Sequence, residues 1–245
     1  MIFANGCFIL IDKNLYAVQQ ISMRHGLKAK NFMTQIYLVR HCESMANRLC
    51  SFAGRTDVDI SAKGRLQLDC LSKYFKDISI DKVYTSSLKR AYKTAEAINF
   101  YHSAPILIDD RFIEMNLGDL DGKPVSAMSD EQQRCWNLAP HLFKVAGGES
   151  MQEVADRAYG GLCALVADNP GKTIAIATHG GVIRNLMRII KGYAPAGLKE
   201  VDWCDNTGVN HIIADDHGDF FVDFENSTVH LSEEAAATPV SAWTE

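Results

Sequence analysis

Short apolar runs and longer amphipathic stretches alternate along the chain from residue 33 to about residue 224. Short apolar runs bounded by polar turns are typical of buried strands. The runs lie at 33–40, 78–84, 106–108 and 172–178. Between them, apolar residues recur at the spacing of one helix face. The predicted helices cover 61–75, which Ser61 would cap, 87–100, 148–168 and 181–191.

The C-terminal part of the pattern predicts a different element. Segments 208–214 and 220–224 flank a polar stretch and predict an antiparallel hairpin with its turn at His217-Gly218. Upstream, strands that alternate with helices over this length predict a mostly parallel sheet with helices on both faces. The expected fold class is therefore α/β, a three-layer α/β/α domain that ends in a C-terminal hairpin.

The two ends of the chain lack this pattern. Residues 1–32 show no clean periodicity, so we interpret them as an N-terminal appendage, either disordered or an artefact of the start codon. Residues 231–245 are mainly Ala, Thr, Ser, Pro and Glu, a composition that cannot bury enough surface to order itself. We expect a single domain over 33–230 and a disordered tail over 231–245.

Composition narrows the class of protein. The 245 residues are 47% hydrophobic and carry a net charge of −5, so they can bury one large core and give no basic footprint for nucleic acid. No run approaches the roughly 18 apolar residues of a membrane span, and the first residues lack the basic start of a signal peptide. The seven cysteines form no Cys-x-x-Cys pair, which disfavours disulfide and zinc frameworks and fits a cytoplasmic protein.

Side chains suited to phosphoryl chemistry follow two of the predicted strands. Arg40 and His41 end the first apolar run, and His179 ends the run at 172–178. Open α/β sheets place their ligand crevices at the carboxyl ends of parallel strands, so we expect these side chains to meet in one pocket. Arginine grips a dianionic phosphoryl group with two parallel hydrogen bonds, and an imidazole can attack phosphorus.

Six short motifs stand in order around these residues. They are Leu38-Val-Arg40-His41-Cys42-Glu43-Ser44 with Asn47, Gly54 to Gly64, Tyr84 to Ala95 with Arg90, Glu114 with Gly118 and Gly122, Gly147-Gly148-Glu149-Ser150, and Thr178-His179-Gly180-Gly181. Each is weak alone, and another Arg-His-Gly at 24–26 follows no strand. Their ordered succession resembles the histidine phosphatase superfamily, also called phosphoglycerate mutase-like, over about residues 34–225.

This resemblance implies roles for four residues around the phosphoryl group. His41 would be the nucleophile, a neutral imidazole that forms a phosphohistidine intermediate. Arg40 and Arg90 would hold the phosphoryl oxygens. His179 would donate a further hydrogen bond to the same oxygens and act as a cation. The role of Arg90 rests on the resemblance, because beside Lys89 and Lys93 the pattern alone suits a solvated helix face.

The resemblance also implies two polar residues at the edge of the site. Asn47 would be a neutral donor at the rim, and Glu114 would give a proton to the leaving alkoxide. Glu149 is a competing acid, although its block also suits a helix start. A metal cluster in the hairpin is disfavoured, because alternating strand residues point to opposite faces. The residues concerned are His211, Asp215, Asp216 and His217. We expect no metal and no cofactor.

The insertion at about 115–147 predicts a small helical cap. Mutases of this superfamily carry a longer basic insertion, whereas this one holds only Lys123, Arg134 and Lys144 as cations. The resemblance therefore favours a phosphatase acting on a small phosphomonoester: α-ribazole phosphate, a sugar phosphate or a broad range of esters. Phosphoglycerate mutase is the alternative, and the oligomeric state is not readable from the sequence.

Cys42 departs from the superfamily, which usually has glycine directly after the nucleophile. A side chain there would crowd the phosphoryl group or change the backbone angle, since glycine permits positive φ and close approach. A phosphate-ester binding protein without turnover is therefore a further alternative. A Cys42 thiolate nucleophile is disfavoured, because cysteine-based phosphatases have arginine five residues on, where this chain has Asn47.

Overall fold

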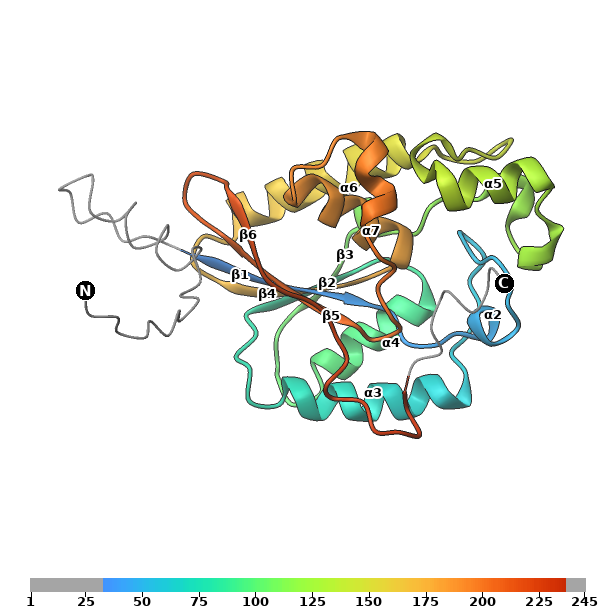
Figure 1. The fold of residues 1–245 in the computed structure, drawn as a ribbon. Helices are drawn as coiled ribbons and strands as arrows, with labels where there is room; N and C mark the ends of the chain where they lie inside the picture. Colours follow the sequence, from blue (N-terminus) through green and yellow to red (C-terminus); the bar gives the residue numbers. More distant parts are fainter. Residues whose placement is uncertain (1–32, 237–245) are drawn as a thin grey trace, which may run out of the picture. The chain divides into compact units, whose positions relative to one another are not determined.

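The computed structural model describes residues 33–236 (Figure 1). The predictions of an appendage over 1–32 and of a disordered tail over 237–245 lie outside the described residues. Residues 231–236 pack on the domain, because Ala235 is buried and its carbonyl oxygen accepts a hydrogen bond from Gln67 Nε2. The predicted disorder therefore does not extend to residues 231–236.

The described strands form one mixed sheet in the order β3-β2-β4-β1-β5-β6. Their bounds are β1 Thr34–Arg40, β2 Lys82–Thr85, β3 Ile106–Ile108, β4 Thr173–Thr178, β5 Val209–Ala214 and β6 Phe220–Ser227. β3, β2, β4 and β1 are parallel, whereas β5 and β6 form the antiparallel hairpin. β1 and β4 are neighbours with Arg40 opposite Thr178. Their carboxyl ends therefore lie side by side.

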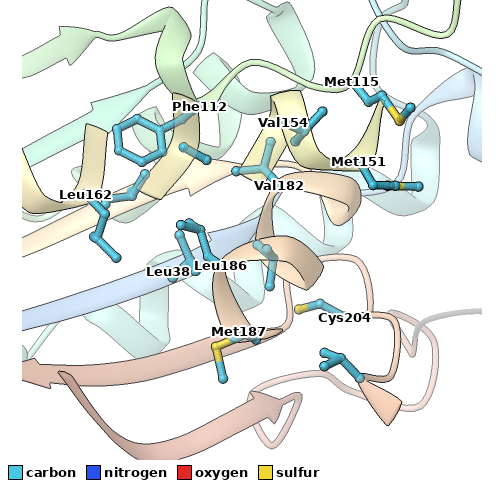
Figure 2. Packing of buried hydrophobic residues seen from close by; sticks show 14 of the residues in the cluster. Leu38, Phe112, Met115, Met151, Val154, Leu162, Val182, Leu186, Met187 and Cys204 are labelled. Carbon is cyan, nitrogen blue, oxygen red and sulfur yellow. The ribbon is translucent and has the colours of Figure 1, made fainter. Parts of the chain in front are cut away.

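Alternating residues of β1 face two hydrophobic cores. Ile36 and Leu38 pack with helices α6 (Met151–Asp168) and α7 (Gly180–Ile190), as Figure 2 shows for Leu38. Val39 packs with α3 (Ala62–Phe75) and α4 (Lys89–Ile98) on the other face. Figure 1 shows these two helix pairs on opposite sides of the sheet. The predicted three-layer α/β/α fold is confirmed.

Side-chain caps set where several helices begin. Ser61 Oγ accepts the backbone N–H of Gly64 and starts α3 as predicted. Ser150 and Glu153 form a capping box, so α6 begins at Met151 rather than at residue 148. The predicted strand over 78–84 is shorter, because Ile78 N–H donates to Phe75 O in the turn after α3. Ile78 and Ile80 pack on the second core from that turn.

The segment after β3 is mostly short helical turns. These are η1 (Asp110–Phe112), η2 (Gly118–Leu120), η3 (Val125–Ala127), α5 (Asp130–Leu138) and η4 (Pro140–Leu142). The last four fall within the predicted cap, and α5 lies on the same side of the sheet as α6 and α7 (Figure 1). The sequence patterns did not predict α2 (Met45–Arg48) or η5 (Pro195–Glu200), which are single turns or little more.

Within residues 33–236, no helix combines the length and the apolar composition that crossing a membrane requires. The same residues contain no group of three or more His, Cys, Asp or Glu side chains arranged to hold a metal ion. In the hairpin, Asp215 Oδ1 instead accepts the backbone N–H groups of His217 and Asp219, and His211 Nδ1 is hydrogen-bonded to Asp223.

Candidate active site

The two histidines meet at the carboxyl ends of β1 and β4. His41 follows β1 and His179 follows β4, and their ring centroids lie 5.2 Å apart. The backbone N–H of His41 donates to Thr178 O at 2.8 Å, which extends the β1–β4 pairing by one residue and fixes the histidines side by side. The sequence-based expectation that these strand ends share one site therefore agrees with the structure.

His41 is held in one tautomer. Its Nδ1 lies 2.7 Å from the carbonyl oxygen of Cys42, which can only accept, so Nδ1 carries the proton and Nε2 keeps a free lone pair. Burial, followed by the charges of Arg90 and Arg40, lowers the pKa of His41 well below the usual histidine value. The ring is therefore neutral at pH 7, as a nitrogen nucleophile must be.

Two arginines flank His41, and backbone carbonyls orient both. Arg40 donates from Nη1 to Cys204 O at 2.5 Å, and its Nε is buried with no partner among the described residues. Arg90 donates to the carbonyl oxygens of the loop at 53–56 and is only 1% exposed. Asp121 accepts three backbone N–H groups of that loop. Arg90 thus lies in a fixed cradle rather than on a solvated helix face.

His179 is completely buried beside His41. Its Nε2 lies 2.7 Å from Ser86 Oγ, and its Nδ1 has no hydrogen-bond partner within residues 33–236. Burial and then the charge of Arg90 lower the pKa of His179 well below the usual value. The prediction that His179 is a cation is therefore wrong for this state of the site, because a charged ring beside two arginines and out of water is unfavourable.

Glu114 reaches the site from the segment after η1. Its Oε1 accepts the N–H of Met115 at 2.8 Å, and its Oε2 accepts the N–H of Gly181 at 3.3 Å. A Cβ atom on Gly181 would lie 2.6 Å from Glu114 Oε1, so a glycine at the start of α7 makes room for this carboxylate. The second glycine of the Gly180-Gly181 pair therefore positions an acid from another segment.

The competing acid Glu149 is engaged elsewhere. It accepts hydrogen bonds from Arg157, Arg55 and the backbone of Asn116. Partial burial alone would raise the pKa of Glu149, but the Arg157 and Asn116 hydrogen bonds hold it below its usual value. Glu149 thus stabilises the loop arrangement and stays ionised, whereas Glu114 lines the pocket.

Asn47 lies at the rim with its amide orientation fixed. Its Oδ1 accepts the backbone N–H and the hydroxyl of Ser44 and, at 3.3 Å, Nδ2 of Asn206. Its own Nδ2 is therefore the group left to donate toward the pocket. Asn206 also donates to His41 O at 2.9 Å, a contact that no sequence motif indicated. The predicted residues Arg40, His41, Asn47, Arg90 and Glu114 all line one pocket, with His179 buried next to His41.

A model of the histidine phosphatase superfamily, branch 1, matches residues 36–227. This chain belongs to that superfamily. It is similar to the uncharacterized phosphatase PhoE of Bacillus subtilis, at 36% identity over 163 residues that cover 66% of this chain and 80% of PhoE. The enzyme class predicted from the sequence, a phosphatase of the histidine phosphatase type, is confirmed at this level.

Two further comparisons concern the activity of a relative and the fold. The chain is 31% identical to a probable phosphoglycerate mutase, GpmB of Cronobacter sakazakii, over 164 residues that cover 65% of this chain and 76% of GpmB. The solved structure of YhfR from Bacillus stearothermophilus superposes with a TM-score of 0.77 at 31% identity, covering 81% of this chain and all of YhfR. Relatives named as a phosphatase and as a probable mutase are therefore similar to this chain in sequence, and YhfR shares its fold.

The cysteine that replaces the superfamily's usual glycine points away from the pocket. Cys42 is fully buried, is not among the pocket-lining residues and does not have a positive φ. Its Sγ lies toward the start of α3, 3.4 Å from where a Cβ on Gly64 would stand. Burial raises the pKa of Cys42 to about 12, so the group is a neutral thiol. The expected crowding is absent, and a Cys42 thiolate nucleophile is contradicted.

The pocket of this histidine phosphatase has a volume of about 560 Å³. Beyond the histidine and the arginines, aromatic residues from the cap and from the loop before β5 form its wall. Trp136 of α5 stacks on Trp203 at 5.3 Å between ring centroids, with Phe52 edge-on to Trp136. Trp203 and Arg184 were not expected, although Arg184 falls one helical turn after Gly180 and that spacing could have indicated it.

Proposed function

We propose that this protein hydrolyses a small phosphomonoester through a covalent phosphohistidine on His41. The observation that carries the proposal is the neutral His41 imidazole, with Nδ1 bonded to Cys42 O and Nε2 free, between two arginines fixed by backbone carbonyls. Such an arrangement presents a nucleophile and the counter-charges for a dianionic phosphoryl group without rearrangement of the site.

In the first step, the Nε2 lone pair of His41 attacks phosphorus in line with the ester bond. The bond from phosphorus to the alcohol oxygen breaks, and its electron pair leaves with that oxygen. Glu114 donates a proton to the oxygen, so a neutral alcohol departs and Glu114 becomes a carboxylate. Arg40 and Arg90 hold the phosphoryl oxygens through the transfer. Neutral His179 donates through Nδ1–H if Ser86 supplies its hydroxyl proton to Nε2.

In the second step, water attacks the phosphorus of phosphohistidine and the bond from phosphorus to nitrogen breaks. Glu114 accepts the proton of the water, so the carboxyl group and the neutral imidazole are both regenerated with inorganic phosphate as the product. No metal or cofactor is needed in this scheme, because arginines supply the charge that a metal ion would otherwise provide.

The small cap supports hydrolysis rather than a mutase reaction, because mutases of this superfamily carry a longer basic insertion. None of the predicted cap cations Lys123, Arg134 and Lys144 lines the pocket. The substrate class is a phosphate ester small enough for about 560 Å³, which includes sugar phosphates and α-ribazole phosphate. We place the reaction in the cytoplasm, since the six described cysteines are all free thiols.

The decisive experiment is rapid quenching with a ³²P-labelled phosphomonoester. We expect label on the protein that is stable in base and labile in acid, and no label on a His41→Asn variant with the same circular dichroism spectrum. An unlabelled wild-type protein that still binds the ester would establish the binding-protein alternative, all the more if Cys42→Gly then gains label. Rapid conversion of 3-phosphoglycerate to 2-phosphoglycerate with 2,3-bisphosphoglycerate present would establish a mutase instead.

A further inference from the structure

A third arginine enters the pocket away from the phosphoryl site. Arg184 lies on α7 and lines the pocket, although only 7% of it is exposed. It follows Gly180 by four residues, so it lies on the same helix face and about 6 Å further along the helix axis. The proposed phosphoryl chemistry gives this residue no role.

The contacts of Arg184 fix its guanidinium and leave part of it unused. Nε donates to Val201 O at 2.7 Å, and Cζ lies 4.7 Å from the centre of the Trp203 ring. Across residues 33–236, no carboxylate forms an ion pair with Arg184 and neither Nη atom makes a hydrogen bond to protein. Burial lowers its pKa to about 10, which still leaves it charged at pH 7. Asp202, which also lines the pocket, acts on Arg184 through its charge and raises that pKa, but it forms no ion pair with the guanidinium. A buried cation without a paired counter-charge is costly, and a ligand carboxylate would supply the missing partner.

Trp203 links this cation to the phosphoryl site. A Cβ on Gly180 would lie 3.4 Å from Arg40 Nε and also 3.4 Å from the Trp203 ring. The same indole ring stacks against the Arg184 guanidinium. The Trp203 ring therefore lies close to the side chain of Arg40 and against the guanidinium of Arg184, so both arginines border the same end of the pocket.

We propose that Arg184 binds a carboxylate of the substrate, so that the preferred esters are short phosphorylated acids. This rests on the proposed function, because the phosphoryl group must occupy the site at His41. With Nε already donating to Val201, the two Nη groups offer the planar end-on fork that pairs with a carboxylate in bidentate fashion. Trp203 and Trp136 would cover the carbon chain between the two anions.

The test compares 3-phosphoglycerate with glycerol 3-phosphate, which share a three-carbon skeleton and differ in a carboxylate against an alcohol. We expect the wild type to favour 3-phosphoglycerate in kcat/KM, and Arg184→Met to reduce that preference about 10- to 100-fold, mainly through KM. Arg184→Lys should retain part of the preference. Arg134→Met removes an equal charge from the exposed face of α5 and should leave the ratio unchanged.

Several outcomes would overturn this role of Arg184. They are a wild type that prefers glycerol 3-phosphate, an unchanged ratio in Arg184→Met, and an equal loss in Arg134→Met. Hydrolysis of p-nitrophenyl phosphate by each variant shows whether the fold and the phosphoryl site are intact. Failure of the proposed function is distinguishable, because the His41→Asn variant tests binding alone. In the His41→Asn background, Arg184→Met should raise the Kd for 3-phosphoglycerate, whether or not the wild type turns over. An unchanged Kd would show that Arg184 does not bind the carboxylate.

Discussion

The floor of the pocket and its wall are built in different ways. At the floor, Arg40 ends β1, and His41 and His179 directly follow β1 and β4. Arg40 and Arg90 are oriented by backbone carbonyl oxygens. At the wall, Trp136 comes from the cap and Trp203 from the loop before β5, and they hold each other by ring stacking. Position is therefore fixed by the sheet at the floor and by side-chain packing at the wall.

This difference indicates that the floor carries out the reaction and that the wall selects the substrate. Groups fixed by backbone hydrogen bonds lose little freedom when substrate binds and act on the reacting atoms. Stacked rings contribute area and shape, each pair about 0.5–1.5 kcal/mol beyond its burial. Changes at the floor should therefore act on kcat by orders of magnitude, whereas changes at the wall should act on KM by about tenfold.

The largest effect is expected for Glu114→Gln, which keeps the shape of the floor and removes its acid. For alkyl phosphates, kcat should fall about 10²- to 10⁴-fold, because the alkoxide must then leave without a proton. For p-nitrophenyl phosphate the loss should be far smaller in the phosphorylation step, since nitrophenolate is a stable leaving group. Burst amplitudes and steady-state rates on both substrates measure this. Equal losses in the burst rates would show that Glu114 acts by position or charge alone.

A smaller loss of the same kind is expected for Gly181→Ala. The added methyl group would lie 2.6 Å from Glu114 Oε1, so the carboxyl group must move. Proton donation should then weaken, with a loss of about 10- to 100-fold in kcat for alkyl phosphates. Gly160→Ala is the matched control, because a Cβ there meets nothing within 4 Å. That change, inside α6, should leave kcat unaltered and raise stability by about 0.5–1 kcal/mol. An unaffected Gly181→Ala would mean that Glu114 has room to shift.

The same division explains what the sequence predicted. The residues of the floor follow from local pattern. A buried apolar run that ends in Arg-His or Thr-His places these residues at the carboxyl end of a parallel strand, where the site of an α/β sheet lies. The charge state of His179 does not follow from local pattern. It depends on burial and on Arg90, which lies on helix α4 and is oriented by the loop at 53–56. A motif names the residue, whereas its protonation is a property of the assembled site.

The wall was largely beyond prediction from sequence. Trp203 and Arg184 lie in segments with no motif, and their place depends on how α7, η5 and the cap pack together. The pattern at 181–191 predicts a helix with a buried apolar face. Arg184 interrupts that face, and only the structure shows that its side chain lines the pocket. The extent of β2 was also missed, because Ile78 and Ile80 pack on the core from a turn.

At the wall, Trp136→Ala should raise KM about tenfold for phosphate esters and change kcat little. The substitution removes the stack on Trp203 and the edge contacts with Phe52 and Phe143, all distant from the reacting bond. Leu138→Ala is the control, since Leu138 is 72% exposed on the same helix and does not line the pocket. A fall in kcat with KM unchanged would mean that Trp136 acts on the reaction step rather than on binding. The proposed difference between floor and wall would then be wrong.

The smallest effect on rate is expected at Cys42, next to the nucleophile itself. Because its side chain lies toward α3 and its backbone needs no positive φ, Cys42→Gly should change kcat/KM by no more than about twofold. Deleting a buried side chain should instead lower the free energy of unfolding by about 1–3 kcal/mol. Thermal unfolding and steady-state kinetics of the same preparation separate the two effects.

Alkylation of the Cys42 thiol gives an independent check of the direction in which this side chain points. Its pKa of about 12 in the folded protein means that thiolate is scarce at pH 8, so iodoacetamide should leave Cys42 unmodified while exposed Cys50 and Cys163 react. Peptide mapping after alkylation reads this directly. Fast modification of Cys42, or a tenfold rise in kcat for Cys42→Gly, would show that this side chain faces the phosphoryl group. The floor would then be partly obstructed in the natural sequence, and binding without efficient turnover would become the better account of the site.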